Sequence, residues 1–344
     1  MVAGEHAPFD PDAAAAAGSG IFGLPETDAP WIGLVPVPFA ATVSYGGGSE
    51  RGPSVIEEAS YQVDLYDHQF GRVYEVGIEL LDADPRLRTA HEQARALALP
   101  ILERGAPLPK DAAAVTAIDA AGDVVNEGTR ARVAELLAQG RLPGVVGGDH
   151  SVPFGAIAAV AERYPGVGIL HIDAHADLRP AYQGLRWSHA SIMHNVLEEV
   201  DAVARIVQVG IRDYCEQELK TILGSEGRVV THFDQDWKRR GFAGETFDAL
   251  CREAVEALPD KVYISCDVDG LDPKLCPATG TPVPGGLTFA EFCHLLAVLA
   301  DSGRHVVGFD LVEVAPGPDD WDANVGARLL YKLCGVAMRT RQAD

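Results

Sequence analysis

The sequence predicts an α/β protein of three layers, α/β/α, in which helices cover both faces of a central, mostly parallel sheet. Short apolar runs alternate along the chain with longer segments of helical periodicity. The apolar runs are nearly continuous, as expected for strands that are buried on both faces. Polar side chains follow three of these runs, and ligand sites in such sheets lie at the carboxyl ends of the strands.

Each expected strand is an apolar run bounded by Gly, Pro or polar residues, and each expected helix is a longer periodic segment between two such runs. Pro53 suits the first turn of a helix, and Gly140 is a typical stop. We expect strands at 31–37, 76–80, 143–147, 167–172, 205–210, 228–233, 261–266 and 305–311. We expect helices at 53–65, 87–104, 123–139, 151–163, 189–199, 214–223, 245–257, 288–301 and 322–338. This β-then-α order favours a parallel sheet.

The chain is expected to form one domain preceded by an arm. Residues 1–20 are rich in Ala, Gly, Pro and Asp, which predicts a flexible N-terminal arm. Residues 30–340 contain no Pro/Ser-rich linker and no internal repeat, so residues 21–344 are expected to form a single domain. The 344 residues, 47% of them hydrophobic, are enough for one large core.

The composition excludes some classes of protein. A net charge of −22 argues against a nucleic-acid binder; it is compatible with steering of a cationic substrate and equally with solubility alone. The six cysteines form no CxxC pair, so we expect reduced thiols and a cytoplasmic protein. No apolar run reaches membrane-spanning length, and the N-terminus lacks the pattern of a signal peptide.

The most informative stretch is His171-Ile-Asp-Ala-His-Ala-Asp177, which follows the apolar run Gly168-Ile-Leu170. Residues two apart in an extended chain point to the same side, so Asp173, His175 and Asp177 converge with only alanines between them. Such polar groups at the end of an apolar strand are costly to bury without a partner. A divalent cation supplies that partner, because carboxylate oxygen and imidazole nitrogen are its usual ligands.

Two further strand ends repeat this chemistry. Asp267 and Asp269 follow the run 262–266, and His150 follows the two glycines of Gly147-Gly-Asp-His-Ser151. The predicted metal ligands are therefore His150, Asp173, His175, Asp177, Asp267 and Asp269. Four carboxylates would over-neutralise one divalent ion but balance two. Two ions close together lower the pKa of a shared water, and this oxygen-rich set suits Mn²⁺, with Ni²⁺ as the alternative.

The three motifs together resemble those of the ureohydrolase superfamily, which includes arginases, agmatinases and guanidinobutyrases. They are GGDHS at 147–151, DAHAD at 173–177 and SCDVDGLDP at 265–273, and the resemblance extends over roughly residues 30–340. It implies an arginase-like fold, a dinuclear manganese site (nickel in guanidine-hydrolase relatives), release of urea from a small guanidino substrate, and a homo-oligomer, a trimer or hexamer.

The resemblance also implies roles for three residues. Glu313, in Asp310-Leu-Val-Glu313, falls on the carboxylate that holds the substrate guanidinium, and His189 on a histidine used in proton transfer. Asp269 would accept a proton as a metal-bound carboxylate. The alternative for His189 is an ordinary polar residue at the start of a helix.

The substrate depends on the loop from Leu178 to Ser188, which lacks the Asn and Ser contacts that arginases use for the α-carboxylate. Arginine is therefore disfavoured, and agmatine, guanidine and guanidinobutyrate remain. Arg179 and Arg186 could hold a substrate carboxylate or be plain surface charges; Tyr182 and Trp187 could shorten the pocket. The loop 43–47 looks more like those of bacterial agmatinase-like proteins and guanidine hydrolases.

Two other classes of function remain as alternatives. One is a non-catalytic subunit that has kept the fold, and the other is an amide hydrolase of the deacetylase type. The complete ligand set disfavours the first, and a deacetylase would use one zinc and would not need six ligands with Glu313. Two metal ions per chain would support the ureohydrolase, one zinc the deacetylase and none the subunit.

Overall fold

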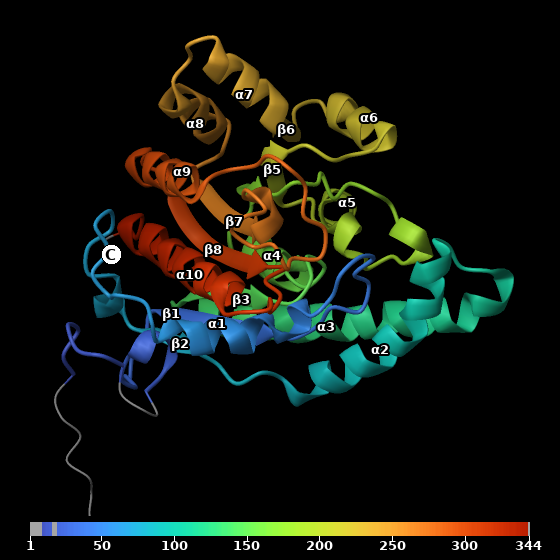
Figure 1. Cartoon of the computed structure of the whole chain (residues 1–344), viewed down its shortest axis with the longest axis horizontal. Helices are drawn as coiled ribbons and strands as arrows, with labels where there is room; N and C mark the ends of the chain where they lie inside the picture. The colour runs from blue at the N-terminus through green and yellow to red at the C-terminus, as the bar shows by residue number, and fades with distance from the viewer. Residues whose placement is uncertain (1–8, 16–18, 343–344) are drawn as a thin grey trace, which may run out of the picture.

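The computed structural model describes residues 9–15 and 19–342 and shows an eight-stranded, all-parallel sheet between two layers of helices (Figure 1). The strands lie in the order β2-β1-β3-β8-β7-β4-β5-β6. Their bounds are β1 Ile32–Val37, β2 Ile78–Leu80, β3 Leu142–Gly147, β4 Val167–Ile172, β5 Val203–Ile211, β6 Val229–Phe233, β7 Lys261–Asp267 and β8 His305–Val312. Every neighbouring pair is parallel, which confirms the predicted three-layer α/β/α class.

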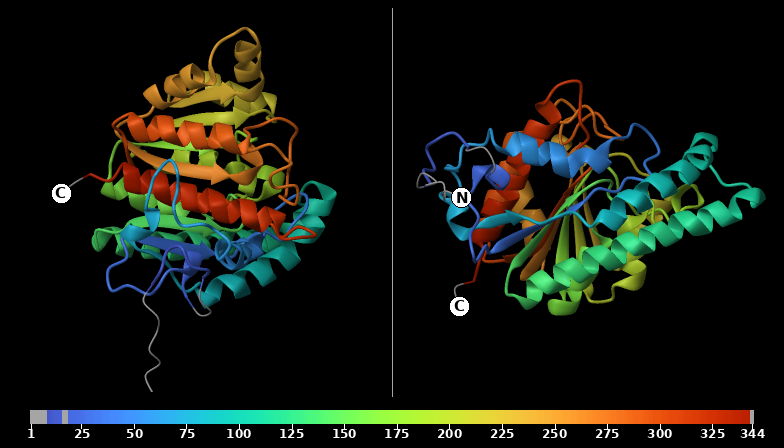
Figure 2. Two further views of the ribbon diagram at one scale, coloured as in Figure 1. Left: turned by 60° about the vertical axis from the view of Figure 1, so that its left-hand side comes forward. Right: turned by 90° about the horizontal axis from the view of Figure 1, so that it is seen from below.

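Each face of the sheet carries its own apolar core. The first core joins the sheet to α1 (Gly52–Ser60), α7 (Asp234–Phe242), α8 (Phe247–Glu256), α9 (Phe289–Asp301) and α10 (Trp321–Arg339). The second core joins it to α2 (Pro85–Arg104), α3 (Ala112–Ala138), α4 (Phe154–Arg163), α5 (Ile192–Glu199) and α6 (Glu216–Gly224). In Figure 2, α2 and α3 form a long antiparallel hairpin that extends past the edge of the sheet.

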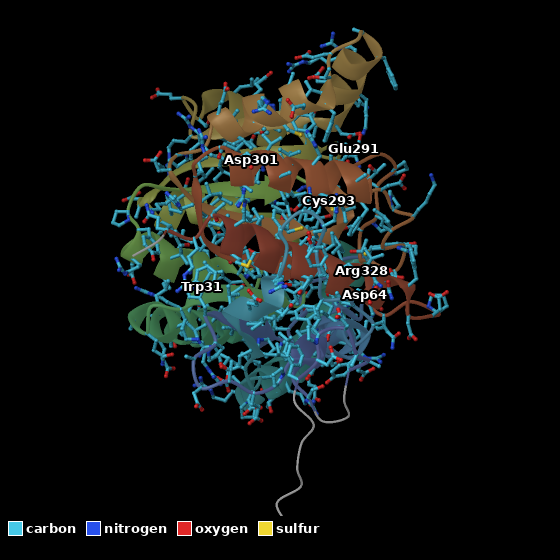
Figure 3. The ribbon with its side chains drawn as sticks, turned by 90° about the vertical axis from the view of Figure 1, so that its left-hand side faces the viewer. Trp31, Asp64, Glu291, Cys293, Asp301 and Arg328 are labelled. Carbon is cyan, nitrogen blue, oxygen red and sulfur yellow. The ribbon has the colours of Figure 1, made fainter. Side chains whose placement is uncertain are left out.

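Figure 3 shows the face that is covered by α9 and α10. Glu291 and Asp301 mark the two ends of α9, and Arg328 lies on α10. Trp31, which is labelled in the same view, precedes β1. The Arg341 guanidinium lies 4.5 Å from the centre of the Trp31 ring. This contact joins the segment after α10, which ends at Arg339, to the start of the first strand.

The structure corrects several expected boundaries. Helix α3 begins at residue 112 rather than 123, and α7 was not expected, because its sequence is almost entirely polar. The expected helix 151–163 begins only at Phe154, so its N-terminus does not directly follow His150. Residues 1–8 and 16–18 of the expected arm lie outside the described residues.

The strand order determines where a site can form. β3 and β4 are consecutive strands along the chain but are separated in the sheet by β8 and β7. The carboxyl ends of β3, β8, β7 and β4 are therefore neighbours at the point where the strand order reverses, which is where ligands bind in such sheets. Within the described part of the chain, no helix is long and apolar enough to cross a membrane.

Candidate metal centre

The six predicted ligands lie at the ends of three of these neighbouring strands. His150 follows β3, Asp173 begins the segment after β4, and Asp267 ends β7. Two glycines allow close backbone packing here: Gly148 packs against the segment after β1, and Gly270 brings the end of β7 close to the end of β4. A Cβ on Gly148 would lie 1.9 Å from the Phe39 carbonyl oxygen, and one on Gly270 would lie 2.7 Å from the Asp173 amide nitrogen.

The ligand atoms form two adjoining groups. In the first, His150 Nδ1 lies 2.9 Å from Asp173 Oδ2, 3.2 Å from Asp177 Oδ2 and 3.3 Å from Asp267 Oδ2. In the second, His175 Nδ1 lies 3.0 Å from Asp269 Oδ2 and 3.5 Å from Asp173 Oδ1. Asp173 thus faces one group with each of its oxygens. These two groups of side chains would hold two ions, and Asp173 would contribute to both groups.

The hydrogen bonds of His150 fit a metal ligand. Ser265 Oγ donates to Asp310 Oδ1 over 3.1 Å, and His150 Nε2 lies 2.9 Å from the same hydroxyl oxygen. Since this hydroxyl proton is directed to Asp310, Ser265 accepts from His150 Nε2, and the free lone pair of the ring is at Nδ1. Nδ1 is buried and has no hydrogen-bond partner in the described structure, although three carboxylate oxygens surround it. A cation fits this position.

The negative charges of the four aspartates also favour bound cations. Asp173, Asp177, Asp267 and Asp269 are at most 4% exposed, and no described Lys or Arg pairs with them. Burial, and then repulsion by Asp173, raises the pKa of Asp177 to about 7. Burial and repulsion by Asp269 raise the pKa of Asp267 well above its ordinary value. Positive charge placed among these carboxylates removes that repulsion, so the residues present fit a dinuclear site.

Glu313 lies beside this cluster, one residue beyond β8, with a left-handed backbone (φ 63°). Its Oε1 accepts from the His150 amide over 3.0 Å, whereas its Oε2 is buried and has no partner among the described residues. Burial, followed by repulsion from Asp149, raises the pKa of Glu313 well above its ordinary value. The carboxylate therefore has one oxygen available to a cationic group.

His189 connects Glu313 to a small pocket. Its Nδ1 lies 3.8 Å from Glu313 Oε1, and its Nε2 lies 3.3 Å from Ser44 Oγ. Burial, with a smaller contribution from the charges of His175 and His150, lowers the pKa of His189 to about 3. The ring is therefore neutral near pH 7.

Comparison with known proteins agrees with this geometry. The profile of the arginase family matches residues 31–335. The chain belongs to the arginase family. It is 32% identical to an N(1)-aminopropylagmatine ureohydrolase of Thermus thermophilus, over 92% of this chain and 94% of that protein. It is 31% identical to an agmatinase of Bacillus anthracis, over 83% and 84% of the two chains.

Solved structures of the arginase family share the fold. The agmatine ureohydrolase of Thermoplasma volcanium superposes with a TM-score of 0.70 at 24% identity and covers 96% of each chain. The arginase of Medicago truncatula superposes with a TM-score of 0.66 at 26% identity, over 90% of this chain and 88% of the other. The predicted arginase-like architecture is thereby confirmed.

In this arginase-family chain the pocket above the cluster has a volume of about 130 Å³. Arg179 and Tyr182, both expected near the substrate, line it. The Arg179 guanidinium lies 4.8 Å from the centre of the Tyr182 ring, and its Nε is 3.3 Å from Glu218 Oε2. The positive charge of Arg179 is therefore already paired.

Trp187 does not line this pocket, contrary to expectation. The ring is 6% exposed, packs on Phe154 with the ring centres 4.8 Å apart, and donates from Nε1 to Asp123 Oδ1 over 2.7 Å. Its indole covers helix α3 at Gly122 and so belongs to the core. Arg186 covers the outer side of Trp187 and pairs with Glu199, away from the pocket lining.

The pocket also contains residues that sequence reasoning did not assign. Ser44, Asp213, Glu218 and Thr281 line it, and Thr281 Oγ1 donates to Asp269 Oδ2 over 3.3 Å. Only Ser44 had a signal in the sequence, since it opens a glycine-rich loop that the family resemblance places near the site. The others come from separate loops whose meeting depends on the fold.

Proposed function

We propose that this chain is a dinuclear-metal ureohydrolase that hydrolyses a guanidino compound, with Mn²⁺ as the metal and Ni²⁺ as the alternative. The observation that carries the proposal is Oε2 of Glu313, a buried carboxylate oxygen that has no hydrogen-bond partner among the described residues and lies beside two groups of side chains that could hold metal ions. A guanidinium presents paired N–H donors to such a carboxylate. The family membership and the names of the relatives support the same reaction class.

The proposed roles follow from the positions of the side chains. His150, Asp173, His175, Asp177, Asp267 and Asp269 would hold two ions. The ions, when bound, would supply Lewis-acid activation and a nucleophilic water at neutral pH. Glu313 would orient the guanidinium, since rate depends on the alignment of the reacting carbon.

Two side chains would serve in proton transfer. Asp269 is oriented by the Ala174 amide, which donates to its Oδ1 over 3.0 Å, and would accept a proton at Oδ2. His189 lines the pocket and would pass a proton from water to the leaving amine.

The pocket favours a substrate without a carboxylate on its tail. Arg179 is the cation of the pocket wall, and its pairing with Glu218 leaves it a weak partner for a second carboxylate. Asp213 adds an exposed negative charge 4.0 Å from His175 Nε2. The volume of about 130 Å³ lies below the several hundred Å³ typical of pockets for drug-sized ligands. We therefore propose agmatine or free guanidine over guanidinobutyrate and arginine.

The test is urea release from these four compounds by protein reconstituted with Mn²⁺ or Ni²⁺. Activity on agmatine or guanidine is expected, with little on the two carboxylates. The variant Asp213→Asn separates the two favoured substrates: it should raise KM for agmatine, which has a cationic tail, and leave guanidine unaffected. Preference for a carboxylate-bearing substrate would refute the argument from Arg179.

A further inference from the structure

His171 is a fully buried histidine beside the proposed ligands whose role the metal site leaves open. Its Nε2 lies 2.8 Å from Asp173 Oδ2, and its ring centre is 5.2 Å from that of His150. Candidate ligand atoms of His150, His171, Asp173 and Asp177 all lie within 4.8 Å of one another. By position alone, His171 could be a third imidazole ligand or a hydrogen-bond donor to Asp173.

The contacts on the far side of the ring decide between these two roles. Gln208 Nε2 lies 3.0 Å from His171 Nδ1 and 2.8 Å from the carbonyl oxygen of Ala176. A backbone carbonyl only accepts, so the side-chain atom that faces it must be the amide nitrogen. The Thr231 hydroxyl donates to the Oε1 of Gln208 over 2.7 Å, which agrees with this orientation. His171 Nδ1 therefore accepts a hydrogen bond.

The orientation of Gln208 fixes the proton on the ring. A neutral imidazole has one N–H, and because Nδ1 accepts, that proton is on Nε2. Nε2 then donates to Asp173 Oδ2, and the only lone pair of the ring points at Gln208, away from the carboxylates. For His171 to bind a metal through Nε2, the Gln208 amide would have to reverse and place its oxygen 2.8 Å from another carbonyl oxygen.

We propose that His171 is a positioning residue for Asp173 and not a metal ligand, held in its donor tautomer by Thr231 and Gln208. Its N–H fixes Asp173 Oδ2, and the His175 amide fixes Oδ1 over 2.6 Å. Asp173 is the one carboxylate that faces both groups of ligand atoms, so its orientation affects both ions. Loss of such a partner lowers metal affinity by about 10–100-fold.

The proton position can be measured on the unaltered full-length chain. Histidine is labelled with ¹⁵N, and long-range ¹H–¹⁵N correlation spectra of the metal-free protein report the tautomer of each ring; His171→Gln assigns the resonance. The expected pattern is a protonated Nε2 and a bare Nδ1. A proton on Nδ1, alone or in an imidazolium, overturns the proposal.

Substitutions test the role of the hydrogen bond. The side-chain amide of His171→Gln keeps a donor at the position of Nε2, whereas His171→Leu removes the donor. Chelator competition with Ni²⁺ should show near-normal affinity for the first and about 10–100-fold weaker binding for the second. His294, which pairs with Asp248 on a different face, provides matched controls: His294→Gln and His294→Leu should both bind metal normally.

X-ray absorption on the Ni²⁺-loaded proteins counts imidazole ligands. The wild type and His171→Gln should show the same number. One imidazole fewer in His171→Gln, or unchanged affinity in His171→Leu, would contradict the proposal. Circular dichroism would show whether His171→Leu folds. If it does not, the tautomer of His171 and the His171→Gln variant still decide whether His171 is a positioning residue or a metal ligand. The inference rests on the proposed ligand role of Asp173, and these metal measurements stand even if no guanidino compound releases urea.

Discussion

Glu313→Gln tests the proposed substrate class rather than the metals. The substitution conserves size and keeps an acceptor for the His150 amide, now 3.0 Å from Glu313 Oε1. It places a neutral NH₂ group at the position of Oε2, which has no hydrogen-bond partner in the described part of the chain. A guanidinium would then lose a charge-assisted contact and meet a donor instead of an acceptor. Hydrogen bonds to charged groups contribute about 1.5–3 kcal/mol, and each tenfold in rate is about 1.4 kcal/mol.

We therefore expect kcat/KM for urea release to fall on the order of 10²-fold or more, about 3 kcal/mol. Metal content should stay the same, because Glu313 is not a proposed ligand. Thermal stability should be equal or higher, since burial and Asp149 already disfavour the ionised carboxylate. Glu57→Gln, a half-buried glutamate on α1, serves as the matched control and should keep full activity. Full activity of Glu313→Gln on all four guanidino compounds would refute the guanidinium assignment.

Three other predictions concern the metals, the pH profile and the core. Asp267→Asn or Asp269→Asn should lower metal occupancy and remove most activity; unchanged elemental analysis and turnover in both would argue against two ions. Activity should rise with pH through neutrality. His189→Ala should lower kcat without moving the midpoint of this pH profile, because the pKa of His189 is about 3 and the ring is already neutral near pH 7. A shifted midpoint would assign the titration to His189. Trp187→Ala should destabilise the fold by about 3–5 kcal/mol in denaturant unfolding while KM stays unchanged; a raised KM would return Trp187 to the pocket.

Much of the fold was predictable because the strands are buried on both faces. Each is a continuous apolar run, and the order of runs and periodic segments gives the parallel sheet. The helix α7 was missed because it has few apolar residues: Trp237 contributes to the core, while Arg239 and Arg240 lie on the polar surface. Tertiary contact, and not periodicity, determines such a short helix.

The candidate site, like the fold, could be predicted from the sequence only in part. Asp173, His175 and Asp177 were predictable because their spacing is local. Trp187 was misplaced because it belongs to the loop that follows the proposed ligand Asp177, whereas its contacts with α3 involve residues about 65 positions earlier along the chain. Glu218 was missed because an acidic residue in a helix is ordinarily a solvated one; here it is 2% exposed and accepts from the Leu178 and Cys215 amides.

Charge connects the fold to the proposed reaction. Four aspartates and Glu313 are buried at the ends of neighbouring strands, and burial, followed by repulsion between the carboxylates, raises the pKa of Asp177, Asp267 and Glu313. Such a cluster opposes folding unless cations neutralise it. Bound metal ions would therefore stabilise the folded arrangement of the residues that hold them. Asp177 and Glu313 also have left-handed backbones, a strained conformation for non-glycine residues that is common at functional sites. Two ions would balance the four aspartates, and a cationic substrate would supply the positive charge that favours the ionised form of Glu313.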